Sequence, residues 1–271
     1  MMMMTNLKPI THYYFLSLIS IFVFSANFCF SQGVIPPCGN HTYSIQSTAI
    51  PNPSFEIYNN CAHFWNDGVN NGYIESEIAS WQRGNAATCD YYNCGYQNPI
   101  EFTTPSTPYP DGNGYVGLGN GYDFSIGNLW KEYIGTLLNS SLSSGTSYEL
   151  TYHITGTSGT GLIPVWFAPY YYGTSNSDVE IVVYGYESNL TLISFPQTPG
   201  WTCPSSADPN WVALGSEIIT TNTTSWTQGS IQFTPASNIQ AIMIGFNCNG
   251  TTGGMDQINT TTGHNGKWDY Y

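Results

Sequence analysis

Positive charge is scarce in this 271-residue sequence, which has 4 Lys and Arg residues against 17 Asp and Glu. The formal net charge is −13 at pH 7. Binding to nucleic acid depends on cations that displace the counterions of the phosphates, so we expect no nucleic-acid partner. An anionic membrane surface is disfavoured for the same reason. A neutral polymer such as a polysaccharide would not be repelled by this chain.

Local catalytic signatures are also lacking. The sequence contains no G-x-S-x-G nucleophile elbow and no H-E-x-x-H zinc motif. The G-x-G-x-x-G match at 112–117 precedes a predicted strand, whereas a dinucleotide site would open a helix. A glycosidase needs two carboxyl groups that face one bond, and no pattern singles out a pair among Glu75, Glu77, Glu132 and Glu180. We therefore expect no enzyme, and a glycoside hydrolase or lyase with carboxylates from separate strands is the alternative.

Helical periodicity is missing as well. From residue 51 onward, no stretch of ten or more residues keeps a 3.6-residue apolar period. Short β-type runs recur instead, and clusters of Gly, Asn, Ser and Pro separate them. The runs cover residues 115–118, 132–138, 148–154, 179–184, 231–233 and 239–246. This pattern predicts an all-β fold of antiparallel sheets.

The amino end carries an export signal pattern. Lys8 and His12 precede an apolar run at 13–30, and the small residue Ser31 stands at a plausible cleavage site. A membrane anchor is the competing interpretation, because the run approaches the length of a membrane span. No cluster of positive residues follows it, which favours cleavage. We predict a signal peptide at 1–31, a secreted or cell-surface protein, and no membrane insertion after cleavage.

The cysteine count fits an exported chain. Seven cysteines are present, and one of them, Cys29, lies in the predicted signal peptide. The remaining even number favours disulfides, and six cysteines allow fifteen pairings. Cys89 and Cys94 could close a small loop, but the sequence leaves the pairing open. The six are Cys38, Cys61, Cys89, Cys94, Cys203 and Cys248.

Aromatic residues are abundant, at 15 % of the sequence. Many lie in polar, glycine-rich surroundings, where a ring could be presented to a ligand. Flat rings with polar edges suit sugars, because the C–H face of a sugar stacks on the ring while hydroxyl groups bond to neighbouring side chains. The alternative is that these rings fill the core. The predicted ligand-binding residues are Trp166, Tyr170, Tyr171, Tyr172, Trp201 and Trp211.

One order of motifs resembles a known family. The motifs are Asn52-Pro-x-Phe55-Glu56 followed by Trp81, Gly114-Tyr115-x-Gly117, Leu142-x-x-Gly145-x-x-Tyr148, and Trp226 with Phe233. Their order resembles the carbohydrate-binding modules of the family 4 and 9 type, which share the galactose-binding-like jelly roll. Trp81 with the run at 90–93 is also similar to secreted surface-protein domains of Bacteroidetes. The resemblance covers residues 51–271 and implies a jelly-roll β-sandwich.

The resemblance also implies a structural Ca²⁺ site. In those modules the Glu of the opening motif holds calcium together with a carboxylate of the last strand, so the candidate ligands are Glu56 and, as the nearest C-terminal carboxylate, Asp269. A Glu56 that only faces solvent is the alternative. Those modules finish on a strand that this sequence lacks, which favours the hypothesis of a fragment of a larger polypeptide.

The expected organisation is a signal peptide at 1–31, a lead-in segment at 32–50 and a jelly roll at 51–271. The expected function is that of an exported, non-catalytic domain that binds a glycan or polysaccharide or mediates adhesion at a cell surface. Its partners would include further domains of the same polypeptide. Besides the glycosidase or lyase, a structural spacer module is an alternative.

Overall fold

A computed structural model of the full chain describes residues 2–3, 49–59, 74–87, 89–93, 109–123, 128–156, 171–172, 178–188, 191–200, 202–221, 225–248 and 266–270. Within these ranges strands dominate, and the two helices, α1 (Ile74–Glu77) and α2 (Pro204–Ala207), have four residues each. The prediction of an all-β fold is confirmed. Among the described residues, no helix has the length and apolar character needed to span a bilayer.

The first of two five-stranded sheets, sheet 1, has the strand order β12-β8-β1-β4-β3. Its strands are β12 (Thr227–Phe233), β8 (Tyr148–Ile154), β1 (Met2–Met3), β4 (Tyr115–Gly117) and β3 (Asp90–Tyr92). All its pairings are antiparallel. In β8 the alternate residues Leu150, Tyr152 and Ile154 are buried, as the sequence pattern predicted. One face of this strand therefore points into the core.

Strand β1 lies within the predicted signal peptide. Met2 pairs with Val116 on one side and with Ile154 on the other, so β1 occupies the middle of sheet 1. Cleavage after Ser31 would remove this strand from the sheet. Residues 4–48, which hold the rest of the signal peptide and most of the lead-in segment, lie outside the described residues.

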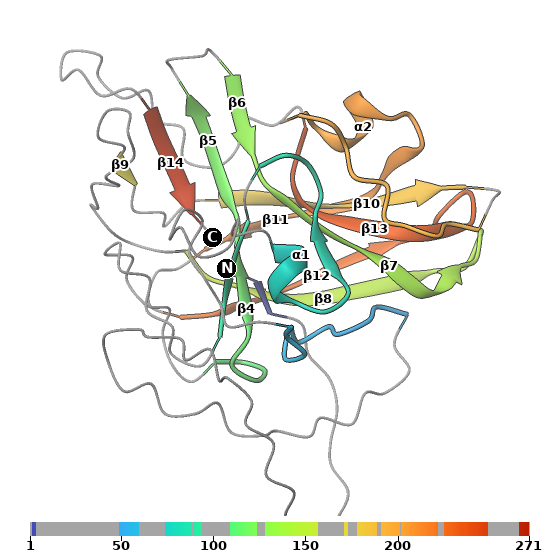
Figure 1. The fold of residues 1–271 in the computed structure, drawn as a ribbon, viewed down its shortest axis with the longest axis horizontal. Coiled ribbons are helices and arrows are strands. Elements are labelled where there is room, and N and C mark those ends of the chain that lie inside the picture. Colours follow the sequence, from blue (N-terminus) through green and yellow to red (C-terminus); the bar gives the residue numbers. More distant parts are fainter. Residues whose placement is uncertain are drawn as a thin grey trace, which may run out of the picture.

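Sheet 2 has the order β11-β10-β13-β7-β2 and is antiparallel throughout. Its strands are β11 (Trp211–Thr220), β10 (Asp178–Glu187), β13 (Ile239–Phe246), β7 (Tyr133–Leu142) and β2 (Trp81–Arg83). Figure 1 shows the long strands β10, β11, β13 and β7 running side by side. The apolar run at 179–184 forms the centre of β10 and is covered on both faces, as its lack of alternation predicted.

The third sheet has four strands in the order β6-β5-β14-β9. They are β6 (Asn128–Lys131), β5 (Gly119–Asp123), β14 (Gly266–Tyr270) and β9 (Tyr171–Tyr172). The β14–β9 pair is parallel, and the other two pairings are antiparallel. In Figure 1 these strands stand at one end of the long strands of sheet 2. β5 follows β4 directly, so the chain passes from sheet 1 into the third sheet at this end.

A main core joins sheets 1 and 2. It contains Ile154 and Ile231 from sheet 1 together with Val183 and Ile244 from sheet 2. Burying such side chains contributes about 1.5–3 kcal/mol each, which makes this core the chief source of stability. Phe55 of the opening motif belongs to the same core and lies 5.0 Å from the Trp81 ring.

The opening motif is fixed by hydrogen bonds as well as by burial. The indole N–H of Trp81 donates to the backbone oxygen of Asn52 at 2.9 Å. The Asn52 side chain donates to the backbone oxygens of Ile57 and Ala79 and accepts from the Ile57 N–H. Asn52 and Phe55 both have positive φ, a conformation that these bonds must hold in place. The motif therefore turns the chain sharply before α1.

An outer cluster lies on the other face of sheet 2. Its buried members are Tyr133, Val182, Tyr184, Phe195, Trp211, Ala241 and Met243. A disulfide between Cys203 and Cys248, with a Cα–Cα distance of 5.4 Å, ties the segment before α2 to the end of β13. The prediction of disulfides is confirmed for this pair. The suggested Cys89–Cys94 loop is wrong, because Cys89 is a free thiol packed in the main core.

Candidate functional site

Most of the aromatic residues predicted to bind ligand escape a structural test. Trp166, Tyr170 and Trp201 lie outside the described residues. Tyr171 and Tyr172 form β9, and they pair with Lys267 and Trp268 of β14. For these two tyrosines the structure describes the backbone only. Their contact with a ligand stays a prediction.

Trp211 is the exception, and its prediction is wrong. Its side chain is buried and packs against Tyr186 and Phe195, with ring centroids 5.1 and 5.7 Å away. Its indole N–H donates to the Pro196 oxygen at 3.0 Å. The segment 191–200 covers this face of sheet 2, so a ring that begins an outer strand is enclosed. Trp211 supports the outer cluster and has no open face for a sugar.

Glu56 organises a turn. Its Oε1 accepts the backbone N–H of Gly114 at 2.6 Å and also the N–H of Asn113. Gly112, with φ +67°, lies so close that a Cβ there would fall 2.1 Å from the Glu56 oxygen. Burial, and then the Glu56 charge, raises the pKa of Asp111. The Glu56 carboxylate thus holds the turn that starts β4.

The predicted calcium ligands are not seen together in the described residues. Asp269 lies in β14 opposite Asn120 of β5, and the structure describes only its backbone. No group of three or more His, Cys, Asp and Glu side chains gathers at a metal-binding distance in the part of the chain with described side chains. A Ca²⁺ site at Glu56 and Asp269 stays a prediction.

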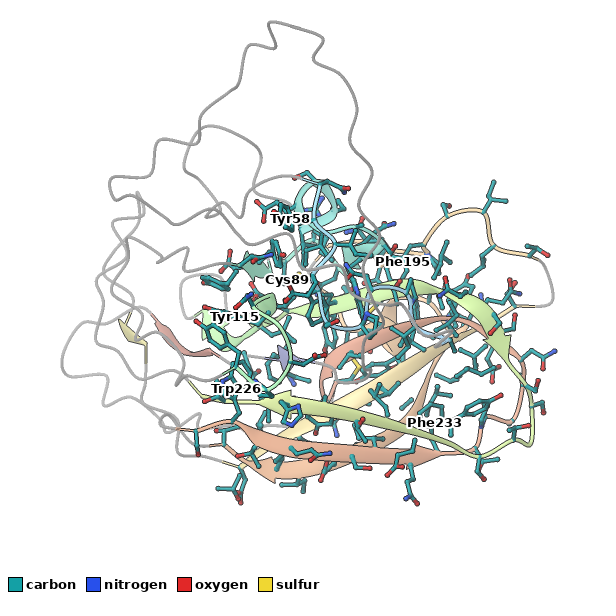
Figure 2. All side chains as sticks on the ribbon, turned by 90° about the horizontal axis from the view of Figure 1, so that it is seen from below. Tyr58, Cys89, Tyr115, Phe195, Trp226 and Phe233 are labelled. Carbon is teal, nitrogen blue, oxygen red and sulfur yellow. A yellow bond between two sulfur atoms is a disulfide. The ribbon has the colours of Figure 1, made fainter. Side chains whose placement is uncertain are left out.

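Four aromatic rings form what we call the Tyr115 cluster, which consists of Tyr92, Tyr109, Tyr115 and Trp226. The Tyr115 centroid lies 5.1 Å from Tyr92, 5.3 Å from Tyr109 and 6.1 Å from Trp226. Tyr109 and Trp226 meet edge to face at 6.3 Å and 82°. Such separations and edge-on angles are the favoured geometry of aromatic pairs. Figure 2 shows Tyr115 and Trp226 at the same end of the molecule.

Strand register brings these rings together. Tyr92 of β3 lies directly opposite Tyr115 of β4, and their rings stack at an interplanar angle of 18°. A directly opposed pair is the closest contact that two antiparallel strands offer. Trp226 is the residue immediately before β12, and its ring completes the cluster. Tyr92 and Tyr115 are buried, whereas Tyr109 and Trp226 are half-buried, so a rigid pair supports a pair that solvent reaches.

The Tyr115 cluster carries no charge of its own. Burial, and then Tyr109, raises the pKa of Tyr115, and burial likewise raises the pKa of Tyr109. Both hydroxyl groups therefore stay protonated at physiological pH, where each can donate and accept a hydrogen bond. Flat apolar faces with neutral polar edges are suited to a neutral, polyhydroxylated ligand.

A shallow pocket of about 200 Å³ lies elsewhere, beside the disulfide. Its lining includes Glu180, Tyr184, Ser205, Ser216, Asn247 and Cys248. The β10–β11 register shifts between Val183 and Tyr184, which leaves Leu214 as an extra residue in β11. Such a bulge bends a strand and is common beside functional sites. The pocket combines one carboxylate, one amide and three hydroxyl groups with the sulfur of Cys248.

Three of the glutamates considered for hydrolysis have separate partners. Glu75 accepts from Arg83 at 3.0 Å, and Glu180 accepts from the Asn247 amide at 2.6 Å. Glu132 accepts the backbone N–H of Gly119 at 2.6 Å. Glu77, in α1, is buried. Each of the three hydrogen-bonded carboxylates is thus engaged in holding a different part of the fold.

Sequence reasoning missed Tyr92, Tyr109 and Trp226 as candidate ligand contacts. Trp226 was noted only as a family motif position, although a Trp in a polar stretch before a strand is a usable signal. The Tyr92–Tyr115 pair depends on the β3–β4 register, which no local pattern reveals. No protein-family model, curated protein or solved structure matches this chain.

Proposed function

We propose that this chain is an exported, non-catalytic domain that binds a neutral glycan through aromatic rings at one end of its sheets. The observation that carries the proposal is the Tyr115 cluster, in which two buried tyrosines hold Tyr109 and Trp226 in place. Rings that are already fixed lose little conformational entropy when a ligand stacks on them. They can therefore supply binding energy from modest contact area.

The fold proposal is a jelly-roll β-sandwich of the galactose-binding-like type. Two antiparallel sheets that share one core support it, although cleavage after Ser31 would remove β1 from sheet 1. The family resemblance at 51–271 points in the same direction. On this proposal, strand ends and loops present the ligand contacts, and Tyr171 and Tyr172 of β9 remain candidate contributors. The calcium at Glu56 and Asp269 would be structural, and the domain would belong to a larger surface protein.

The mode of binding follows from composition. Few charged groups are present, so affinity should come from stacking and neutral hydrogen bonds and should change little with salt. Single sites of this kind bind weakly, in the micromolar to millimolar range, and repetition on a cell surface raises their combined strength.

A glycan array probed with the wild-type protein and two matched variants tests the proposal. Trp226→Ala removes a half-buried ring just before β12, and Phe233→Ala removes a half-buried ring at the far end of the same strand (Figure 2). Phe233 stacks on Tyr148, outside the Tyr115 cluster. We expect Trp226→Ala to weaken glycan binding about tenfold or more, as loss of one stacked ring does, while Phe233→Ala retains it.

Two results would contradict the proposal. One is a folded wild-type protein that binds no glycan on a broad array. The other is an equal loss in both variants, because it would show that the Tyr115 cluster has no special role. Circular dichroism of each variant establishes that it is folded before binding is compared.

A further inference from the structure

Three polar side chains lie together beside sheet 2, namely Lys131 at the end of β6, Glu180 of β10 and Asn247 just after β13. Tyr133 pairs with Gly245, and Ile181 pairs with Phe246. Continuing these antiparallel registers to the ends of the strands brings Lys131 and Glu180 to either side of Asn247. The hydrogen bonds agree with this placement. The Lys131 amine donates to the backbone oxygen of Asn247, and the Asn247 amide donates to Glu180 Oε2 at 2.6 Å.

Lys131 is an unusual lysine. It is one of only four cationic residues in the sequence, and its side chain is 4 % exposed. Burial lowers the pKa of Lys131 to about 8, although the nearby Glu180 charge acts in the opposite direction. A substantial fraction of the amine is therefore neutral at mildly alkaline pH. A neutral amine is the nucleophilic form, and desolvation is one way in which proteins activate lysine.

The residues around Lys131 and Asn247 keep bulk water away from the site, as the proposed kind of reaction requires. Tyr133, the second residue after Lys131, packs edge to face on Tyr184 at 5.9 Å. The Tyr184 hydroxyl bonds to the backbone at Phe246 and Cys248, the residues on either side of Asn247. Glu180 and Asn247 also line the pocket of about 200 Å³, which gives a small leaving group a way out. The disulfide at Cys248 fixes the adjacent backbone.

We propose that Lys131 and Asn247 form an intramolecular isopeptide bond, with Glu180 as the acid–base residue. The neutral Lys131 Nζ attacks Asn247 Cγ, so that an Nζ–Cγ bond forms and the Cγ–Nδ2 bond breaks. The Glu180 carboxylate takes a proton from Nζ and delivers it to Nδ2, which departs as ammonia. Glu180 then returns to its starting form. The exchange of one amide for another needs no oxidant, metal or cofactor.

The proposal explains why an amine, an amide and a carboxylate share one largely buried site. The bond would join residues 116 positions apart and lie next to the Cys203–Cys248 disulfide. Unlike the disulfide, it would survive reduction. A link between Lys131, two residues before β7, and Asn247, the residue after β13, would hold these neighbouring strands of sheet 2 together, which is useful to a domain exposed outside a cell. This proposal does not depend on glycan binding.

Mass spectrometry of the exported protein under reducing conditions tests the proposal. We expect the wild-type mass to be lower by one ammonia than its sequence requires, and a digest to contain a branched peptide that joins Lys131 to Asn247. Lys131→Arg retains the charge and Glu180→Gln retains the shape, and neither variant should contain the branched peptide. Cyclisation of Gln32, the residue exposed by the predicted cleavage, also releases ammonia. That loss would persist in both variants, whereas the loss caused by the isopeptide bond would disappear.

A folded wild-type protein whose digest releases a separate peptide ending at Lys131 would overturn the proposal, because trypsin cannot cleave after a modified lysine. A branched peptide that persists in Glu180→Gln would overturn the role given to Glu180. Should Lys131→Arg fail to fold, Asn247→Ser provides a second variant that retains the free amine and removes the electrophile. It is also expected to lack the branched peptide, and a branched peptide in it would contradict the assignment of Asn247.

Discussion

The two faces of sheet 2 differ in chemistry although the same strands supply both. The face toward sheet 1 is lined by aliphatic side chains such as Val179, Ile181 and Ile244, which pack without polar partners of their own. The outer face is built from Tyr133, Tyr184, a disulfide and a buried lysine. The inner face therefore supplies most of the apolar burial, and the outer face places polar groups in an aromatic, partly dry environment. We therefore expect a reaction between side chains, such as the proposed isopeptide bond, only on the outer face.

Removing the disulfide should have the largest effect on stability. The bond closes a 45-residue separation, for which chain-entropy estimates give about 4 kcal/mol. We expect the double variant Cys203→Ser with Cys248→Ser to lose an amount of that order in urea unfolding monitored by circular dichroism. A loss below about 1 kcal/mol, at the low end of measured disulfide effects, would show that the covering segment is held by packing alone.

Neighbouring residues of β13 allow a direct comparison of the faces. Ile244 and Met243 are both fully buried, but Ile244 faces the main core and Met243 the outer cluster. We expect Ile244→Ala to lower the free energy of unfolding by about 3–4 kcal/mol and Met243→Ala to lower it by about 2 kcal/mol. The smaller loss is expected for Met243 because the outer cluster is smaller and adjoins a pocket into which it can relax. Urea unfolding measures both, and the exposed Ile218→Ala serves as the control. A larger loss for Met243→Ala would reverse the ranking of the two faces.

Alkaline pH should affect the outer face through Tyr184. Burial raises the pKa of Tyr184 to about 12, above its unfolded value near 10. The folded state then holds the hydroxyl proton more tightly than the unfolded state does. The contribution of protonated Tyr184 to stability is therefore fully present below pH 10 and is lost as the pH rises toward 12. We expect the free energy of unfolding to fall by about 2 kcal/mol between pH 10 and pH 12, and we expect a smaller fall in Tyr184→Phe. An identical pH profile for wild type and Tyr184→Phe would contradict the assignment.

Much of the fold could be predicted from local pattern. The alternation at Tyr148–Ile154 matched β8, whose burial has a period of two residues. The apolar run at Ile239–Phe246 matched β13, which is buried along nearly its whole length. Strand β11 was missed, since Gly215, Ser216 and an inward Glu217, which accepts from the Tyr152 hydroxyl, interrupt its apolar pattern.

The sites were harder to predict because they depend on long-range register. Tyr115 and Trp226 are far apart in the sequence, and Lys131 is 116 residues from Asn247. No local spacing signals either contact. Trp211 shows the opposite problem, because a Trp in a polar segment can be covered by another part of the chain. The composition of the sequence limits the class of ligand, but the strand pairing is needed to identify the aromatic rings that would contact the ligand.

Isothermal titration of the array-selected glycan, at low and at high salt, tests the central claim most directly. The account predicts a dissociation constant in the micromolar to millimolar range that is nearly the same at both salt concentrations for wild type and Phe233→Ala. Trp226→Ala should weaken binding about tenfold or more under both conditions. Binding that survives in Trp226→Ala, or that is lost at high salt, would contradict a neutral aromatic site at the Tyr115 cluster.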